Sequence, residues 1–309
     1  MPLVLVSSRR FVDHVTPVGH PERPERAEAL QSVAAAFREQ GGEVVEPRAA
    51  TDEDLLRVHT QEHVDAIVAT RGKATMIDED TFTSPDSDEI ARLAAGAVLT
   101  GVDRVLDGPT GSRALVLVRP PGHHAEADRA MGFCLYSNIA VGAAYARSRG
   151  CARVAIVDYD VHHGNGTQWI FYEDPSVLFV SSHQYPFYPG TGAASEKGRG
   201  EGLGFTLNIP LDVGAKDDEI EGKYAEQVLP AVRAFKPDLL MISAGFDAHE
   251  MDPLGQLRMT TAGFGRLTKT LVDLANEVCD GRVVLVTEGG YDLKALSDSL
   301  QAVVDACLP

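Results

Sequence analysis

The sequence is poor in cysteine and has no long apolar run. Its four cysteines, Cys134, Cys151, Cys279 and Cys307, are scattered without paired spacing. This excludes a disulfide framework and is typical of reduced, buried thiols in a cytoplasmic protein. The apolar stretch at residues 3–6 is too short for the core of a signal peptide, and no run approaches the roughly 18 residues of a membrane span. We therefore expect a cytoplasmic protein without a membrane segment.

Basic residues are outnumbered in this chain. Lysine and arginine total 28 against 45 aspartates and glutamates, so the formal net charge is −17. We expect no binding of nucleic acid, because the phosphate backbone would repel such a chain. An acidic surface favours cationic substrates, although solubility alone also accounts for the charge. The 309 residues contain no linker, internal repeat or low-complexity tract, and we interpret 1–309 as one domain.

The stretch around which the chain is organised is VAIVDYDVHHGNG at residues 154–166. Its first four residues form an apolar run, which is typical of a parallel strand buried on both faces. Asp158, Asp160 and His162 alternate after it, so in an extended segment their side chains share one face. Carboxylates and an imidazole at the carboxyl end of a buried strand make half of a metal site.

Apolar strands alternate with helical segments through the rest of the chain. Strands are expected at 2–7, 44–45, 114–118, 153–160, 177–182, 205–210, 238–244 and 282–287, and helices within 20–42, 52–71, 88–106, 136–149, 167–172, 218–235, 261–278 and 292–307. We expect a loop at 78–87 and interpret the glycine-rich stretch 189–204 as a flexible cover. This alternation predicts an α/β fold, with a parallel sheet and helices on both of its faces.

Four of the expected strands end in polar residues, at 123–124, 158–162, 246–247 and 288–291. If the sheet is parallel, these residues converge on one edge of it. Asp160, His162 and Asp247 then offer one nitrogen and two carboxylates. Three protein ligands with a vacancy for water are the pattern of a catalytic zinc site, where the ion lowers the pKa of bound water and polarises a carbonyl.

His123 and His124 are adjacent, so only one of them can face a substrate directly. Each needs a partner that orients its ring, and Asp158 and Asn165 are the candidates. A carboxylate raises the pKa of an imidazole more than a neutral amide does. We therefore expect the two histidines to differ in basicity, with one as general base and the other as electrostatic support.

Tyr291 follows two glycines, Gly289 and Gly290, which let the backbone turn sharply and leave the ring beside the site. Its hydroxyl can donate a hydrogen bond to a developing oxyanion. The alternative is a tyrosine that merely covers the start of the next helix.

Together these motifs resemble the histone deacetylase family, which includes zinc-dependent lysine deacylases and acetylpolyamine amidohydrolases. The matching pieces follow the family's order and are HPERPER at 20–26, RPPGHHA at 119–125, GFC at 132–134, DYDVHHGNGTQ at 158–168, SAGFDAHEMDPLG at 243–255 and EGGY at 288–291. Asn165 and the wording GNGTQ are closer to the class II branch and its bacterial relatives than to class I.

The resemblance implies an arginase-like, three-layer α/β/α fold around a mainly parallel sheet of eight strands, with one zinc ion per chain. It assigns the role of zinc ligand to Asp160, His162 and Asp247. His124 is the general base and acid with Asn165 behind it, and His123, paired with Asp158, is its partner. Tyr291 is the oxyanion donor. The family also carries structural monovalent cations such as K⁺. By resemblance one is held around Asp158, Asp160, His162 and Ser181, and a second near Phe171, Asp174 and Val177.

A tunnel for the acyl-lysine stem is also implied by the resemblance. The Gly132 carbonyl receives the substrate amide N–H, and Phe133 and Tyr188 form the walls. Gly289 also contacts the substrate, Leu254 lines the rim, and Arg26 lies near an exit for acetate. Tyr188 stands where the family usually has phenylalanine, with Phe187 just ahead of it. A hydroxyl at that wall argues against a strict preference for a plain alkyl stem.

The leading hypothesis is a zinc hydrolase that removes acetyl or other short acyl groups from acyl-lysine in proteins or peptides. An acetylpolyamine deacetylase is the alternative. A binuclear manganese ureohydrolase is more distant, because its extra ligands could only come from His249 and Asp252. A non-catalytic acyl-lysine binding module is also more distant, because a reader needs neither a base nor Tyr291. Members of the family occur as monomers, dimers and tetramers, so a homo-oligomer is compatible with the sequence.

Overall fold

The computed structural model describes residues 3–308, and a sheet of eight strands forms its centre. Across the sheet these are β2 (Glu43–Val45), β1 (Leu3–Ser7), β5 (Arg113–Leu117), β10 (Val283–Thr287), β9 (Leu239–Ala244), β6 (Val154–Asp158), β7 (Val177–Gln184) and β8 (Thr206–Leu211). Every pairing between neighbours is parallel, so the predicted parallel sheet is confirmed. Pro2, which we included in the first strand, lies outside the described residues.

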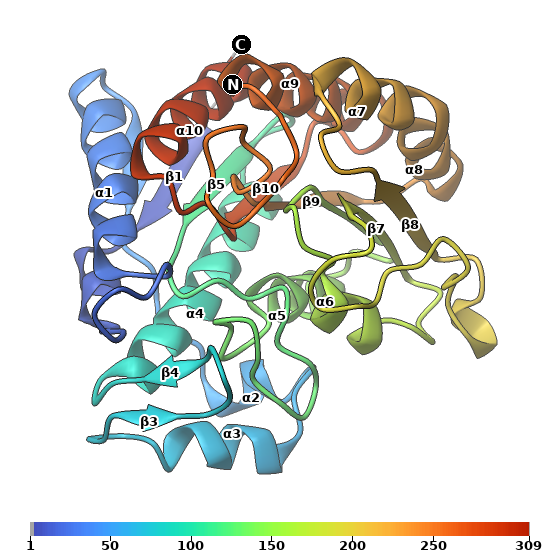
Figure 1. The fold of residues 1–309 in the computed structure, drawn as a ribbon. Coiled ribbons are helices and arrows are strands. Elements are labelled where there is room, and N and C mark those ends of the chain that lie inside the picture. The colour runs from blue at the N-terminus through green and yellow to red at the C-terminus, as the bar shows by residue number, and fades with distance from the viewer. Residues whose placement is uncertain (1–2, 309) are drawn as a thin grey trace.

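Helices cover both faces of this sheet, which confirms the three-layer arrangement (Figure 1). One face is covered by α1 (Pro24–Glu39), α7 (Asp217–Lys223), α8 (Leu229–Phe235), α9 (Thr261–Val278) and α10 (Leu293–Cys307). The other is covered by α4 (Ser87–Leu106), α5 (Asn138–Ser148) and α6 (Asn165–Ile170), with α2 (Asp52–Leu55) and α3 (Gln61–Val68) packed outside α4 and α5. No helix within residues 3–308 combines the length and the apolar character that crossing a membrane requires.

The apolar strands explain why both faces are covered. All five residues of β5 are buried. Leu115 and Leu117 point into the core beneath α1, α9 and α10, whereas Ala114 and Val116 point into the core beneath α4 and α5. Side chains alternate between the two faces of a strand, so a strand with apolar residues on both faces must be covered on both.

Three segments differ from the elements expected from the sequence. The stretch 78–87 is not only a loop, because β4 (Phe82–Thr83) forms an antiparallel hairpin with β3 (Thr75–Met76). A 3₁₀ helix, η1 (Arg9–Asp13), follows β1. The helix expected at 218–235 contains a π-helical turn, η3 (Tyr224–Val228), between α7 and α8. Pro230 follows that turn, and its missing N–H accounts for the change in hydrogen bonding there.

The glycine-rich stretch 189–204 is tied to the rest of the molecule, which corrects its interpretation as a flexible cover. It contains one short 3₁₀ helix, η2 (Gly200–Gly202). The Glu196 carboxylate accepts the N–H groups of Gly192 and Ala193 at 3.1–3.2 Å and the side-chain amide of Gln168 at 2.6 Å. Gln168 belongs to α6, so this carboxylate joins the loop to a helix beside the sheet.

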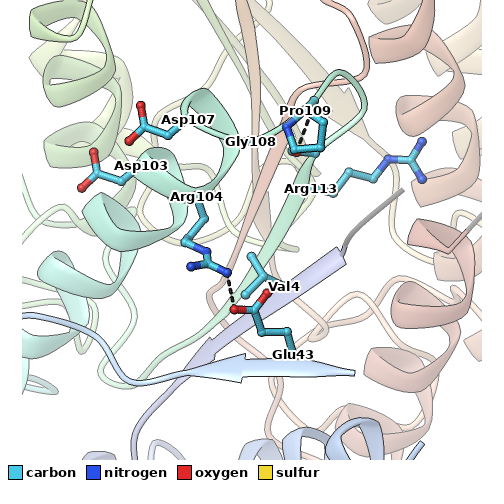
Figure 2. Close-up of a pocket in the computed structure, with 9 residues that line it drawn as sticks. Val4, Glu43, Asp103, Arg104, Asp107, Gly108, Pro109 and Arg113 are labelled. Atoms are coloured by element: carbon cyan, nitrogen blue, oxygen red, sulfur yellow. Dashed lines mark hydrogen bonds and ion pairs between the residues drawn. The ribbon is translucent and has the colours of Figure 1, made fainter. Parts of the chain in front are cut away.

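A cavity of about 290 Å³ opens at the amino ends of β1 and β5, and we call it the amino-edge groove (Figure 2). It is lined by Val4, Glu43, Asp103, Arg104, Asp107, Gly108, Pro109, Ser112 and Arg113. The ion pair between Arg104 and Glu43 in this groove is exposed, with 43% and 52% of the two side chains accessible. The groove lies at the opposite edge of the sheet from the polar residues that follow the strands.

Candidate metal and active site

Asp160, His162 and Asp247 meet at the carboxyl edge of the sheet. One ligand atom from each lies within 4.8 Å of the others. The two carboxylates have no exposed surface, and 12% of the His162 side chain is accessible. Asp160 and His162 follow β6 and Asp247 follows β9, and these two strands are neighbours in the sheet. The parallel register therefore brings Asp247 next to Asp160 and His162, which lie far from it in the sequence.

The inference that Asp158, Asp160 and His162 share one strand face is wrong. β6 ends at Asp158, and the chain then turns. The Asp160 N–H donates to Asp158 Oδ1 at 3.1 Å, and the His162 N–H donates to Asp160 Oδ1 at 2.9 Å. A tight turn in which carboxylates accept backbone N–H groups thus brings Asp160 and His162 together. The Asp158 carboxylate instead contacts His123.

The three side chains fit a metal ion of the zinc type. His162 Nδ1 lies 3.1 Å from Asp160 Oδ1 and 3.2 Å from Asp247 Oδ2. Ligand atoms placed tetrahedrally at about 2.0–2.1 Å from a zinc ion are about 3.3 Å apart. Asp247 Oδ2 is buried and accepts no hydrogen bond of good geometry, which is costly for a carboxylate oxygen unless a cation faces it.

Backbone N–H groups hold the two carboxylates in place. Val161 donates to Asp247 Oδ1 and Gly289 donates to Asp160 Oδ2, both at 2.9 Å. A Cβ at Gly289 would overlap the carboxylates of both Asp247 and Asp160. Glycine is therefore required at this position, because the backbone after β10 passes directly against the carboxylates of Asp160 and Asp247.

His123 and His124 have different partners, in the arrangement that the resemblance implied. His123 Nδ1 lies 2.9 Å from Asp158 Oδ2, and His124 Nδ1 lies 2.7 Å from Asn165 Oδ1. The Asn165 amide nitrogen donates to Glu126 Oε1 at 2.8 Å, which orients its oxygen toward His124. The network therefore assigns the proton of neutral His124 to Nδ1 and leaves Nε2 free to accept another.

The two imidazoles differ in basicity, as their partners predicted. Burial disfavours the charged form of His123, but the carboxylates of Asp160 and Asp158 outweigh it and raise its pKa well above the usual value. For His124, burial and the neighbouring His123 and His162 lower the pKa well below the usual value. The pair thus combines a charged imidazole with a neutral one.

Tyr291 lies between an arginine and an aromatic ring. The Cζ atom of Arg26 lies 5.0 Å from the centre of its ring, and the Phe133 ring packs edge-on at 5.8 Å. The Tyr291 backbone N–H donates to Asp252 Oδ2 at 2.6 Å. Burial raises the pKa of the phenol well above 10, although Arg26 acts in the opposite direction, so the hydroxyl keeps its proton and remains a donor.

Aromatic side chains pack around His124, His162 and Tyr291. The Tyr188 ring packs edge-on against His124 at 5.2 Å and against His162 at 5.9 Å. Phe187 stacks on His162 at 5.3 Å. Phe133 adopts a positive φ of 68° and donates its N–H to Thr81 Oγ1 at 3.1 Å. The hairpin formed by β3 and β4 therefore supports one of the two predicted tunnel walls.

The remaining predicted substrate residues lie next to these walls. Gly132 also has a positive φ, and a Cβ there would collide with the ring of His124. Its carbonyl accepts the thiol of Cys134 at 3.3 Å. Leu254 and Tyr291 line a cavity of about 780 Å³ together with residues from 16–28. Gly132 therefore lies against His124, and Leu254 shares a cavity with Tyr291; their roles in substrate binding remain a prediction.

The residues predicted to hold monovalent cations form two groups. Ser181 pairs with Asp158 across β7 and β6, and its hydroxyl lies 2.9 Å from His183 Nδ1. Phe171, Asp174 and Val177 form the turn from α6 to β7, in which the carbonyls of Phe171 and Asp174 already accept backbone N–H groups. The structure brings each group together, and bound cations there remain a prediction.

Sequence reasoning gave no role to Glu288. Its buried carboxylate accepts the N–H groups of Gly122 at 2.7 Å and His123 at 3.1 Å, and the hydroxyl of Ser243 at 2.9 Å. It thereby fixes the backbone that carries the two histidines. A carboxylate directly after an apolar strand was the available signal, because burial there demands partners.

The extra ligands considered for a second metal do not join the three-residue group. His249 Nε2 lies 3.1 Å from the hydroxyl of Thr261. The Asp252 carboxylate accepts the backbone N–H groups of Leu254, Tyr291 and Asp292. Asp252 therefore holds the backbone of Tyr291 in place.

Comparisons with known proteins agree with this geometry. The family model described as "Histone deacetylase domain" matches residues 20–307. Histone deacetylase 15 of Arabidopsis thaliana is 43% identical over 94% of this chain and 53% of that protein, so the chain spans about half the length of this relative. The histone deacetylase-like amidohydrolase of Pseudomonas aeruginosa is 41% identical over 88% of this chain and 73% of that protein.

A solved structure has the same fold. The crystal structure of the HDA15 HD domain superimposes on this chain with a TM-score of 0.92 and 39% sequence identity, and the match covers 100% of this chain and 89% of that one. The probable deacetylase of Archaeoglobus fulgidus is 41% identical over 94% of this chain and 81% of that protein. With the family model matched over nearly its whole length, this chain belongs to the histone deacetylase family.

Proposed function

We propose that this chain is a zinc-dependent hydrolase that removes acetyl or other short acyl groups from the ε-amine of acyl-lysine in proteins or peptides. One observation carries the proposal: the side chains of Asp160, His162, Asp247, His124 and Tyr291 converge at one edge of the sheet. Membership of the histone deacetylase family supports it. In this proposal residues 1–309 act as one deacetylase domain with one zinc ion.

Asp160, His162 and Asp247 would hold the zinc ion, which when bound lowers the pKa of a water molecule and polarises the acyl carbonyl. His124 accepts the proton of the attacking water at Nε2, because its Nδ1 is engaged with Asn165. The Asp158 carboxylate, 2.9 Å from His123 Nδ1, favours the protonated form of the imidazole next to this base. When the amide bond breaks, a histidine returns a proton to the leaving amine.

Tyr291 stabilises the negative charge that develops on the acyl oxygen. Its hydroxyl stays protonated because burial raises its pKa, and it donates a hydrogen bond to that oxygen. Removal of one such donor typically costs about 3–4 kcal/mol of transition-state stabilisation. Gly132 would accept the substrate amide N–H at its carbonyl, and Tyr188 and Phe133 would flank the stem.

An acetylpolyamine is the second candidate substrate, and one observation favours it. Tyr188 has a raised pKa because of burial, and because of the negative carboxylates of Asp80 and Asp78 nearby. Two carboxylates beside the outer wall would attract the free ammonium groups of a polyamine. Leu254 provides an apolar rim instead of a further carboxylate, which favours the acyl-lysine reading.

Turnover of acetyl-lysine peptides and acetylspermidine by the zinc-loaded protein, measured side by side, separates the two. Preference for the peptides is the expected result. Preference for acetylspermidine that is lost in an Asp80→Asn variant would instead make the chain a polyamine deacetylase. Tight binding of acyl-lysine peptides without turnover of any acyl group would contradict catalysis and indicate a binding module.

Three further expectations accompany the function. The four cysteines are free and buried, and we infer a reducing, cytoplasmic location from their scattered pattern. Structural K⁺ ions at the two groups described above are inferred from the family alone. A homo-oligomer is compatible with both proposed substrates.

A further inference from the structure

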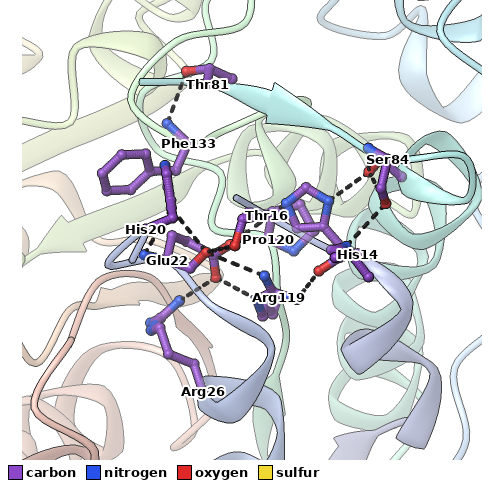
Figure 3. Close-up of polar contacts among 12 residues, drawn as sticks. His14, Thr16, His20, Glu22, Arg26, Thr81, Ser84, Arg119, Pro120 and Phe133 are labelled. Carbon is purple, nitrogen blue, oxygen red and sulfur yellow. Dashed lines mark hydrogen bonds and ion pairs between the residues drawn. The ribbon is translucent and has the colours of Figure 1, made fainter. Parts of the chain in front are cut away.

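Glu22 is a buried carboxylate that no step of the proposed reaction uses, and it contacts both Arg26 and Arg119 (Figure 3). Its side chain has no exposed surface. Oε1 accepts hydrogen bonds from Nη1 of Arg26 at 3.0 Å and from Nε of Arg119 at 2.6 Å. Oε2 accepts none and faces His14 Nε2 at 3.6 Å. One carboxylate thus joins two arginines that are themselves fully buried.

Arg119 anchors Glu22 from the sheet side. It follows β5, and its Nη1 donates to the carbonyl of Phe11 at 3.0 Å and to that of His14. Its Nη2 donates to the Glu22 carbonyl at 3.3 Å. With its guanidinium fixed by backbone carbonyls, Arg119 gives the Glu22 carboxylate one defined position.

Arg26 reaches from the same carboxylate to the segment that ends in Tyr291. Its Nε donates to the carbonyl of Gly290 at 2.6 Å and its Nη2 to the carbonyl of Glu288 at 2.5 Å. Its Cζ lies 5.0 Å from the centre of the Tyr291 ring. Gly290 has a φ of 125°, a conformation that only glycine adopts readily, so this segment depends on outside contacts to hold its course.

The charge on Glu22 is needed for this arrangement. A buried guanidinium is costly unless an anion accompanies it, and Glu22 is the carboxylate that bonds to Arg26. Burial alone would raise the pKa of Glu22, but Arg119 and Arg26 outweigh it and lower the pKa, so the carboxylate stays ionised. Without it, Arg26 would lose the partner that keeps it at the Gly290 and Glu288 carbonyls.

We infer that Glu22 is a positioning residue for Tyr291, and that it acts through Arg26 from an anchor provided by Arg119. The inference deepens the proposed function and rests on it, because Tyr291 is the oxyanion donor there. Since Arg26 also lies near the implied acetate exit, the experiment must separate positioning of Tyr291 from release of the product.

Single-turnover measurements on a Glu22→Gln variant make that separation, because they report bond cleavage before product release. Glutamine keeps the shape of Glu22 and removes its charge. We expect the single-turnover rate constant to fall by about 100-fold, the cost of misplacing a reacting group by roughly 1 Å, with KM little changed. In a Tyr291→Phe background the same substitution should cost little, because the donor that it positions is already absent.

A crystal structure of the metal-free Glu22→Gln variant provides a readout that does not depend on activity. We expect the Arg26 guanidinium to leave the carbonyls of Gly290 and Glu288, and the Tyr291 ring to move with it. Glu39→Gln, at the exposed end of α1, is the matched control and should change neither rate nor structure. Arg119→Lys serves as a second variant if Glu22→Gln does not fold.

Wild-type single-turnover rates in both Glu22→Gln and Arg119→Lys would overturn the inference, as would an unmoved Tyr291 in their crystal structures. A multiple-turnover defect without a single-turnover defect would assign Glu22 to product release and would also overturn it. Failure of the unaltered protein to cleave any acyl substrate would instead contradict the proposed function. The displacement of Tyr291 in the crystal would still test the role of Glu22.

Discussion

The two edges of the sheet both carry charged side chains, but in different states. At the amino-edge groove (Figure 2), the Arg104–Glu43 pair is largely exposed. At the carboxyl edge, Asp160 and Asp247 have no exposed surface. Exposed ion pairs add little free energy, whereas a buried carboxylate is costly without a partner or a cation. The comparison teaches that buried charge, more than a cavity with charged walls, indicates where this molecule does chemistry.

The largest difference between the two edges is expected for an aspartate-to-asparagine change. Asp247→Asn removes the charge of a proposed zinc ligand, one of whose oxygens accepts no hydrogen bond, so the protein should lose zinc and all measurable turnover. Asp103→Asn, in the groove, should change neither. Metal content by elemental analysis and turnover of an acetyl-lysine peptide are the measurements, and normal zinc content in Asp247→Asn would remove Asp247 from the ligand set.

Loss of a single hydroxyl should give the next largest contrast. Tyr291→Phe removes the oxyanion donor and should lower kcat by about 10²–10³-fold while zinc stays bound. Tyr145 is the matched control, because its hydroxyl donates to Asp103 near the groove at 2.8 Å, and Tyr145→Phe should leave kcat unchanged. Turnover of Tyr291→Phe near the level of the unaltered protein would sink the role of this hydroxyl.

Acid should lower the free energy of unfolding through the buried side chain of His59. Burial, and then His63, lower its pKa to about 3, and its Nε2 accepts the Ser137 N–H at 2.9 Å, which requires the neutral ring. The unfolded chain protonates this histidine near pH 6.5 and the folded chain does not, so stability is lost as pH falls from about 6.5 toward 3, by about 1.4 kcal/mol per unit.

Urea unfolding at several pH values between 7 and 4 measures this loss. A His59→Gln variant cannot take up the proton and should show a shallower fall in the free energy of unfolding. Equal slopes for the variant and the unaltered protein would mean that His59 is already charged in the folded state.

The smallest effect is expected in the groove itself. Glu43→Gln breaks the exposed pair with Arg104, and exposed pairs contribute about 0–1 kcal/mol. Stability should therefore change by no more than this, and turnover should not change. A large loss of turnover in this variant would contradict the assignment of function to the carboxyl edge alone.

The sequence was sufficient for the sheet and for the residues that follow its strands. Apolar runs such as that before Asp158 are typical of strands buried on both faces, and parallel pairing then dictated which polar ends converge. The hairpin of β3 and β4 was missed because strands of two residues have no readable alternation. Its place depends on tertiary contacts such as that between Thr81 and Phe133.

The supporting carboxylates escaped prediction for a different reason. Asp252 and Glu288 accept backbone N–H groups from distant parts of the chain, and Glu22 accepts a hydrogen bond from the distant Arg119. Nothing local in the sequence specifies those partners. The turn after β6 was also hidden, because alternation along the chain is the same whether a strand continues or ends at Asp158.

Metal titration of the stripped protein is the most direct test of zinc-dependent deacylation at the carboxyl edge. Zn²⁺ is added in steps to the metal-free chain while turnover of an acetyl-lysine peptide is followed. Turnover should rise linearly and reach its plateau at one equivalent per chain, and the Asp247→Asn variant should show no rise. A plateau only at two equivalents, or turnover that does not depend on added metal, would contradict a single zinc held by Asp160, His162 and Asp247.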